Sequence, residues 1–241
     1  MKLALFDIDG TLTKTISADE ICFTRAYQLA LGVDKINTDW SVYRHCTDSW
    51  IALEIIQDQF QRDPLNGEVA HVKAAYVGQL RQAQARDPDF FLPIPGAREM
   101  LEKLLSLKEW AVGIATGGWE PSARFKMKSA GMGDFDIPYS TADDAFSRED
   151  ILRIAIEKAR LAWNRDRFDR IVSIGDGTWD VICARELGIP FLGIADGKQE
   201  QRLRELGAEV IVPDYRDLDG FLETLEQVSN LQIPQTKELE P

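Results

Sequence analysis

A short apolar strand that ends in two aspartates is the feature that most constrains the fold of this chain. The run Leu3-Ala4-Leu5-Phe6 is followed within four residues by Asp7, Asp9 and Gly10. A continuous apolar run bounded by glycine is typical of a buried parallel strand. Ligands bind at the carboxyl ends of the strands in such sheets, so we expect both aspartates to face a functional pocket.

Two carboxylates at this position suit phosphoryl transfer. Gly10 lets the chain turn sharply, so both side chains can face one pocket. Asp7 can then attack phosphorus and carry it as an aspartyl-phosphate, while Asp9 protonates the departing oxygen and later deprotonates a water. Because the two acids repel each other and the phosphate, we expect a bound cation, and oxygen ligands favour Mg²⁺. The alternative is an ordinary turn that closes a strand.

Composition and charge narrow the class of protein. The chain has 241 residues, 44% of them hydrophobic, which is enough for one good core, or for one core plus a small accessory domain. We find neither the roughly 20 apolar residues of a membrane helix nor a signal-peptide pattern, so we expect a cytoplasmic protein that does not bind membranes. The formal charge of −12 opposes binding to nucleic acid. Three scattered cysteines favour neither disulfides nor zinc.

The hydrophobic pattern divides the chain into a helical segment and an alternating one. Residues 14–93 predict three helices, at about 17–32, 48–60 and 68–85. The first opens with a capping-box sequence at Ser17 and packs through Ile21, Ala26, Leu29 and Ala30. From residue 94 to 230, helices alternate with strands at 110–115, 170–174, 191–194 and 209–212, which predicts an α/β fold with a doubly wound parallel sheet. Residues 231–241 predict a flexible tail.

Two further motifs follow predicted strands. Thr116 and Gly117 come after the strand at 110–115, where a hydroxyl and an amide can hold phosphate oxygens. Asp176 and Asp180 follow the strand at 170–174 and add two acids at the same sheet edge. Each motif also has an ordinary structural interpretation, as a turn, a helix cap or a residue that favours the helix dipole.

Taken together, these motifs resemble those of the haloacid dehalogenase-like hydrolase superfamily, in the phosphoglycolate-phosphatase-like branch. The resemblance implies a Rossmann-like core made of residues 1–13 and 94–230, with a small all-helical cap domain at 14–93 inserted after the first strand. It implies that Asp7 is the nucleophile, Asp9 the acid and base, and Thr116 a phosphoryl ligand. It also implies that Asp7, Asp9, Asp176 and Asp180 hold Mg²⁺, with Asp9 contributing its backbone carbonyl.

The chain departs from this family pattern at the third motif. A lysine is usual there, and this sequence offers Arg148, which can bridge a carboxylate and a phosphate because it keeps its charge. The alternative is that Arg148 is a solvated residue of a helix's first turn and that Lys126 or Lys158 serves instead.

The family resemblance implies a Mg²⁺-dependent phosphatase of a small phosphorylated metabolite, acting as a monomer or homodimer. Asp9 favours a phosphate ester, because haloacid dehalogenases lack an acid at that position. A sugar phosphomutase with the same two aspartates and a non-enzymatic phospho-accepting or sensing domain are the alternatives. In the cap, Arg44, His45 and Thr47 are candidates for contact with the leaving group, and Trp119 and Trp179 for the pocket entrance.

Overall fold

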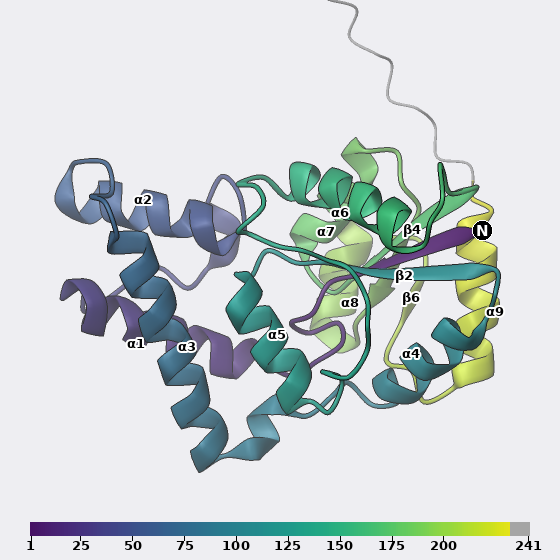
Figure 1. Cartoon of the computed structure of the whole chain (residues 1–241), viewed down its shortest axis with the longest axis horizontal. Coiled ribbons are helices and arrows are strands. Elements are labelled where there is room, and N and C mark those ends of the chain that lie inside the picture. The colour runs from purple at the N-terminus through teal and green to yellow at the C-terminus, as the bar shows by residue number, and fades with distance from the viewer. Residues whose placement is uncertain (232–241) are drawn as a thin grey trace, which may run out of the picture.

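A six-stranded parallel sheet forms the centre of the molecule and lies beside a group of three helices (Figure 1). The computed structural model describes residues 1–231. The strand order is β3-β2-β1-β4-β5-β6, so β1 lies in the middle of the sheet and Asp7 at the middle of its carboxyl edge. The strands are β1 (Lys2–Phe6), β2 (Trp110–Ala115), β3 (Tyr139–Ser140), β4 (Arg170–Gly175), β5 (Phe191–Ile194) and β6 (Ile211–Val212).

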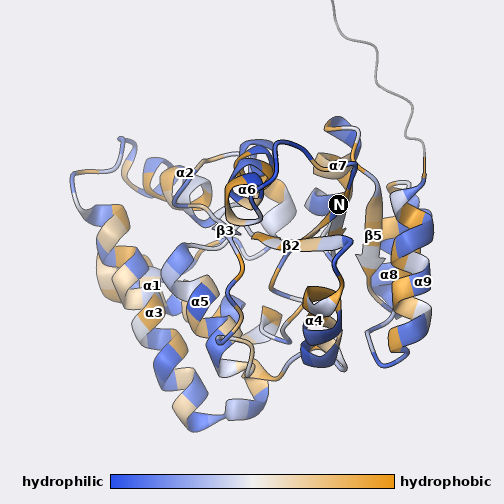
Figure 2. Cartoon of the chain, turned by 45° about the vertical axis from the view of Figure 1, so that its right-hand side comes forward, coloured by the Kyte–Doolittle hydropathy of each residue, from blue (hydrophilic) through white to orange (hydrophobic). Residues whose placement is uncertain are grey.

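Both faces of the sheet are covered by helices because successive side chains of β1 point to opposite faces. Ala4 and Phe6 pack in one buried cluster with residues of α4 (Ala97–Ser106), α5 (Glu120–Ser129) and α9 (Leu218–Ser229). Leu3 and Leu5 pack in another with α6 (Arg148–Ala162) and α7 (Thr178–Glu186). The helix α8 (Gly197–Glu205) packs beside α7 and β5. Figure 2 shows hydrophobic and hydrophilic residues alternating around α4 and α9, as expected of helices with one buried face.

Three helices are inserted between β1 and α4, and we call this group the cap. They are α1 (Ile16–Leu31), α2 (Asp48–Phe60) and α3 (Glu68–Arg86), with 3₁₀ turns at Trp40–Val42 and Pro88–Phe91. The buried cluster of the cap also contains Trp119 and Ala142, which belong to loops of the sheet domain. The cap therefore shares its hydrophobic interior with the core.

The two segments that join the cap to the core run side by side. The Lys14 amide donates a hydrogen bond to the Leu92 carbonyl over 2.8 Å, and the Ile94 amide donates to the Leu12 carbonyl over 2.9 Å. Thr13 and Pro93 form an antiparallel bridge. The entry and exit of the cap are therefore tied to each other as well as to the core.

The predicted fold class is confirmed: a doubly wound parallel sheet with a helical insertion after the first strand. The domain limits at 13/14 and 93/94 remain predictions. Of the predicted tail, only Leu231 belongs to the described residues. Within residues 1–231, none of the helices combines the length and hydrophobicity needed to cross a membrane.

Details of the predicted elements need correction. The strand β3 was missed, because two residues carry too little pattern to be recognised. The capping box at Ser17 is wrong: α1 begins at Ile16 after Thr15, and Ser17 lies inside its first turn. The predicted inward stripe of α1 is also wrong at Ile21 and Leu29, which are exposed, because the aromatic residues Phe23 and Tyr27 define its buried face.

Candidate active site

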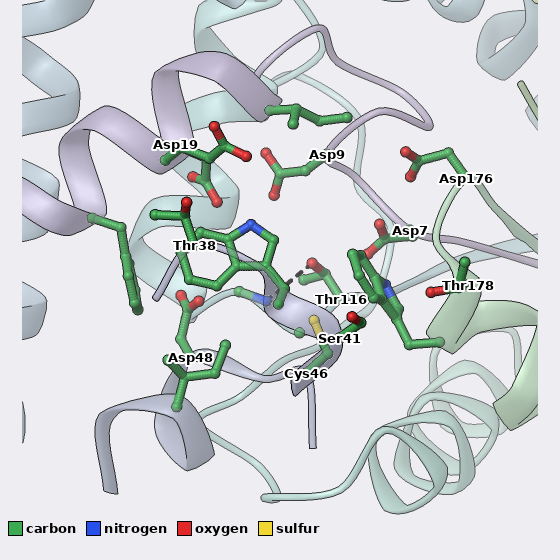
Figure 3. Close-up of a pocket in the computed structure, with 18 of the residues that line it drawn as sticks. Asp7, Asp9, Asp19, Thr38, Ser41, Cys46, Asp48, Thr116, Asp176 and Thr178 are labelled. Atoms are coloured by element: carbon green, nitrogen blue, oxygen red, sulfur yellow. Dashed lines mark hydrogen bonds between the residues drawn. The ribbon is translucent and has the colours of Figure 1, made fainter. Parts of the chain in front are cut away.

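A cavity of about 690 Å³ lies between the carboxyl edge of the sheet and the cap. Figure 3 shows Asp7 and Asp176 on one side of this space and Asp19, Thr38 and Asp48 on the other. The sheet domain contributes the phosphoryl-transfer residues expected from the sequence, and the cap contributes the opposite wall. The lining residues of the core include Asp7, Asp9, Thr116, Gly117, Arg148, Asp176, Trp179 and Arg202, and those of the cap include Asp19, Glu20, Phe23, Asp39, Trp40 and Asp48.

Three buried carboxylates converge at the ends of β1 and β4. Asp7 directly follows β1, Asp176 follows β4, and Asp180 lies in the first turn of α7. One oxygen from each lies within 4.8 Å of the other two. We call these residues, with Arg148, the strand-end cluster. Parallel strands deliver their loops to one edge, so residues 169 positions apart meet there because of the topology alone.

The turn after β1 requires glycine. Gly10 has a φ of +79°, in the left-handed region, and a Cβ there would lie 2.1 Å from Oδ2 of Asp176. The next residue, Thr11, donates a hydrogen bond from its hydroxyl to Oδ1 of Asp176 over 3.2 Å. The Asp-Gly-Thr sequence therefore does more than close a strand, because it also positions an acid from β4.

Arg148 is the cation of the strand-end cluster. Its Nη1 donates to Oδ1 of Asp180 over 2.8 Å and lies 3.5 Å from Oδ1 of Asp7. Its Nε donates to the Cys46 carbonyl of the cap over 2.9 Å. The side chain is only 11% exposed, so the interpretation of Arg148 as a solvated residue is wrong. Lys158 instead binds the Tyr139 carbonyl and Asp144.

The electrostatics of this cluster fit a divalent cation. Burial raises the pKa of Asp7 to about 7, and repulsion by Asp180 adds to the effect while Arg148 opposes it. Burial and the charges of Asp7 and Asp180 raise the pKa of Asp176 well above its ordinary value. One guanidinium does not compensate three buried carboxylates, and an all-oxygen donor set suits a hard divalent ion. The Asp9 side chain points elsewhere, so its predicted role as a ligand would fall to its backbone carbonyl.

The phosphate-binding candidates lie beside these acids. Thr116 is 2% exposed, and its amide donates to the Ser140 carbonyl of β3 over 3.0 Å. Its hydroxyl accepts a hydrogen bond from the Gly118 amide over 3.2 Å, drawn as a dashed line in Figure 3. A Cβ on Gly117 would lie 2.6 Å from Nη2 of Arg148, so only glycine leaves room for that guanidinium.

Asp9 belongs to a second group of charges around Lys126, which the sequence offered only as an alternative to Arg148; the grouping itself was not predicted. Nζ of Lys126 donates to Oδ2 of Asp9 over 2.8 Å and also pairs with Asp19 of the cap. The Thr15 hydroxyl donates to Oδ1 of Asp9. Lys126 is only 1% exposed. Burial lowers the pKa of Lys126, but Asp19 and Asp9 raise it by more, so the net shift is upward and the amine stays charged.

Asp48 completes this group, which we call the interface cluster: Asp9, Asp19 and Asp48 with Lys126. The Asp48 amide donates to the Gly117 carbonyl over 2.8 Å, and its Oδ2 accepts from the Trp119 amide over 2.9 Å. Burial raises the pKa of Asp48 to about 8, with repulsion by Asp19 adding to it and Lys126 opposing it. Burial likewise raises the pKa of Asp19 to about 6. The cluster thus places three carboxylates against one ammonium at the cap–core boundary.

The cap residues predicted from the sequence, Arg44, His45 and Thr47, are not among the described residues that line the cavity. The guanidinium of Arg44 lies 5.8 Å from the ring centre of Trp50, and His45 packs edge-on against the same ring. The Thr47 hydroxyl accepts from the Trp50 amide and donates to the Phe146 carbonyl over 2.6 Å, so it caps α2 and ties it to the core. Their neighbours Cys46 and Asp48 line the cavity instead.

The two tryptophans have different surroundings. Trp179 lines the cavity, whereas Trp119 is fully buried in the hydrophobic cluster of the cap. One signal for the interface cluster is present in the sequence: Lys126 interrupts the apolar stripe that Ala123 and Met127 form on α5 and that its C-cap residue Ala130 continues. A lysine within such a stripe must find a buried anion.

Comparisons with known proteins agree with this geometry. A family model described as haloacid dehalogenase-like hydrolase matches residues 1–188. A phosphoglycolate phosphatase from Agrobacterium fabrum is 26% identical over 223 residues, which are 91% of each chain. A hydrolase structure from Pseudomonas syringae superposes with a TM-score of 0.70 at 21% identity, covering 92% of this chain and 98% of the other. A putative β-phosphoglucomutase from Bacteroides vulgatus superposes with a TM-score of 0.67 at 17% identity, covering 96% and 91%. The last two likenesses concern the fold.

Proposed function

The chain belongs to the haloacid dehalogenase-like hydrolase family, and we propose that it is a Mg²⁺-dependent phosphatase acting on a small phosphorylated metabolite. One observation carries the proposal. The Asp7 carboxylate lies beside Asp176 and Asp180 in a site suited to a divalent ion, and Asp9 faces the same cavity. A nucleophile and a proton donor therefore meet where a phosphoryl group can be held.

The first half of the reaction transfers the phosphoryl group to the protein. A carboxylate oxygen of Asp7 attacks phosphorus, and the bond from phosphorus to the leaving oxygen breaks. Asp9 donates a proton to that oxygen, so the alcohol leaves uncharged. The Thr116 hydroxyl and the Gly117 amide hold phosphoryl oxygens, and Arg148 contributes positive charge to them. Mg²⁺ held by Asp7, Asp176 and Asp180 would supply further charge neutralisation.

The second half regenerates Asp7. Asp9, now deprotonated, takes a proton from a water, whose oxygen attacks phosphorus. The bond between phosphorus and the Asp7 oxygen breaks, and inorganic phosphate is released. Lys126 and Thr15 hold the Asp9 carboxylate in place for both steps.

A nucleophile substitution tests this mechanism. We expect Asp7→Asn to abolish release of inorganic phosphate from a screen of phosphorylated metabolites, with circular dichroism unchanged, because the amide keeps the shape and loses the nucleophile. Phosphoglycolate belongs in that screen, since a relative carries its name. Asp136→Asn, at an exposed aspartate, is the matched control. Retention of a tenth of the activity by Asp7→Asn would refute the assignment.

Metal removal is the complementary test. EDTA should remove the activity, and Mg²⁺ should restore it, because the strand-end cluster needs a compensating charge. Asp176→Asn should raise the Mg²⁺ concentration needed for half-maximal activity. A phosphomutase would use the same two aspartates, and it would convert its substrate to an isomer without releasing phosphate, so product analysis separates the two activities.

A further inference from the structure

We propose that the leaving group of the substrate carries no negative charge and donates hydrogen bonds to carboxylates of the cap, through an ammonium group or hydroxyls. This inference rests on the proposed function, because it takes Asp7 as the position of the phosphoryl group. The wall of the cavity opposite Asp7 must then contact the leaving group. That wall belongs to the cap, and its chemistry decides which leaving groups fit.

The charged residues that the cap contributes to this wall are all acidic. The cap residues that line the cavity include four acids, Asp19, Glu20, Asp39 and Asp48, and no lysine or arginine among the described residues. Thr38 and Ser41 add hydroxyls, and Phe23 and Trp40 add aromatic rings. A carboxylate or second phosphate on the leaving group would meet repulsion at short range in a partly desolvated cavity, where charges are poorly screened. An ammonium or hydroxyl group would find acceptors and rings there.

Among the acids of the cap wall, Asp48 gives the strongest evidence for a bound ligand. Its side chain is nine-tenths buried and lines the cavity. Its Oδ2 accepts a hydrogen bond from the Trp119 amide, and the side-chain hydrogen bonds within residues 1–231 include none to Oδ1. A carboxylate oxygen held in this way is an acceptor that a bound hydrogen-bond donor would satisfy.

The available cations are already engaged elsewhere. Lys126 is shared between Asp9 and Asp19, and Arg148 is shared between Asp180, Asp7 and the Cys46 carbonyl. The remaining lining cation, Arg202, is an exposed residue of α8 on the core side. A phosphate ester adds further negative charge near Asp7. The cap wall is therefore left with unpaired acids that a cationic or neutral donor complements.

A matched set of ligands tests the inference by binding alone. Glucosamine 6-phosphate, sorbitol 6-phosphate and 6-phosphogluconate have six-carbon leaving groups that carry an ammonium, only hydroxyls, and a carboxylate. We would titrate each into the Asp7→Asn protein with Mg²⁺ by calorimetry, so that turnover does not interfere. A set with two-carbon leaving groups, phosphoethanolamine, 2-hydroxyethyl phosphate and phosphoglycolate, repeats the comparison in case the six-carbon leaving groups are too long for the cavity.

We expect the ammonium or hydroxyl ligand of at least one set to bind about tenfold more tightly than its carboxylate counterpart, a difference of about 1.4 kcal/mol. The comparison between ammonium and hydroxyl ligands identifies which donor the cap prefers. Asp48→Asn in the same background should shrink the preference, and Asp58→Asn, at an exposed position of the same helix, should keep it. Asp39→Asn provides a second variant if Asp48→Asn fails to fold.

Equal or tighter binding of the carboxylate ligands in both sets would overturn the inference. The proposed function has a separate test, because phosphate release by the wild-type enzyme is measured independently of these affinities. A phosphatase that prefers phosphoglycolate would leave the proposed function intact and refute only the inference.

Discussion

The cavity is bounded by two clusters of buried charge that look alike and are built differently. The strand-end cluster gathers Asp7, Asp176 and Asp180 around Arg148, and the interface cluster gathers Asp9, Asp19 and Asp48 around Lys126. Each has three carboxylates and one cation. The first comes entirely from the core, whereas two of the three acids of the second come from the cap. The difference is that the first cluster groups three carboxylate oxygens closely enough to hold a divalent ion, whereas the second holds its acids through Lys126 and cap–core hydrogen bonds.

Removal of Lys126 should produce the largest change in stability. Lys126→Met leaves Asp9, Asp19 and Asp48 without their cation, and breaking a buried ion pair by removing one partner costs about 3–5 kcal/mol. Urea unfolding measures the loss in the free energy of unfolding. Lys128→Met, at an exposed position of the same helix, is the matched control and should cost less than about 0.5 kcal/mol. A loss below about 1 kcal/mol for Lys126→Met would show that the interface cluster is not held by this charge.

Arg148 offers the contrasting case, in which catalysis suffers more than the fold. Arg148→Met should lower kcat/KM by about 100-fold, or roughly 2.7 kcal/mol, because a donor to the phosphoryl oxygens is lost. Mg²⁺ should raise the melting temperature of this variant more than that of Lys126→Met, since the ion enters only the strand-end cluster. Arg153→Met, on the exposed side of the same helix, is the control. An equal rise in melting temperature with Mg²⁺ in Arg148→Met and Lys126→Met would contradict the proposal that the ion enters only the strand-end cluster.

Titration of Asp48 gives a smaller effect with a defined sign. Its pKa is raised from 3.8 to about 8 in the folded protein, so the folded state binds more protons than the unfolded state between these values. Stability should therefore be highest at low pH within this window and should fall as pH rises toward 8, by at most about 1.4 kcal/mol per pH unit for this one proton.

The measurement is the melting temperature from pH 5 to 8 with saturating Mg²⁺, which suppresses the contribution of the strand-end cluster. Asp48→Asn should flatten the slope, because the amide does not titrate, and Asp58→Asn should leave it unchanged. An unchanged slope in Asp48→Asn would mean that the carboxyl titrates in its ordinary range.

The two clusters also differ in how far the sequence predicts them. An apolar run precedes each of the residues Asp7, Thr116, Asp176 and Asp180. Parallel topology brings the carboxyl ends of such strands to one edge of the sheet, so the local sequence pattern was enough to predict that these residues lie together. The sheet and the helical insertion were predictable for the same reason. Their functional roles remain predictions, but the structure places Asp7, Asp176 and Asp180 close together and Thr116 in the lining of the same cavity.

The same reasoning named Asp9 and, as an alternative cation, Lys126, but it did not predict that they form a cluster with Asp19 and Asp48. Its members stand at 9, 19, 48 and 126, and they meet only through tertiary contacts, in which Asp19 of α1 pairs with Lys126 of α5 and Asp48 of α2 bonds to the Trp119 amide just before α5. Tertiary packing of this kind has no periodic signature. The same limit explains the candidates Arg44, His45 and Thr47, which came from the correct loop, although the cavity is lined by the residues between and after them.

The smallest expected effect tests how the cap is held over the interface cluster. The Ser49 hydroxyl of α2 donates to the Ala142 carbonyl over 2.6 Å and accepts from Nε1 of Trp119 over 2.8 Å, so one side chain joins the cap to two core loops. Ser49→Ala leaves a carbonyl and an indole N–H without this partner and should cost about 1 kcal/mol of unfolding free energy. Ser41→Ala is the control, because the Ser41 hydroxyl bonds to Asp39 within the cap, and it should leave the cap–core contacts unchanged.

Hydrogen exchange gives a more specific measurement of the same contact. Ser49→Ala should speed exchange of the Asp48 and Trp119 amides, which bond across the cap–core boundary, without affecting the strand amides of β1. If phosphate and Mg²⁺ draw the cap toward the core, they should restore protection of those two amides and of Lys14 and Ile94 in the connecting segments. Equal exchange in both variants, with and without ligand, would indicate a cap fixed by its shared hydrophobic interior and not by these polar contacts.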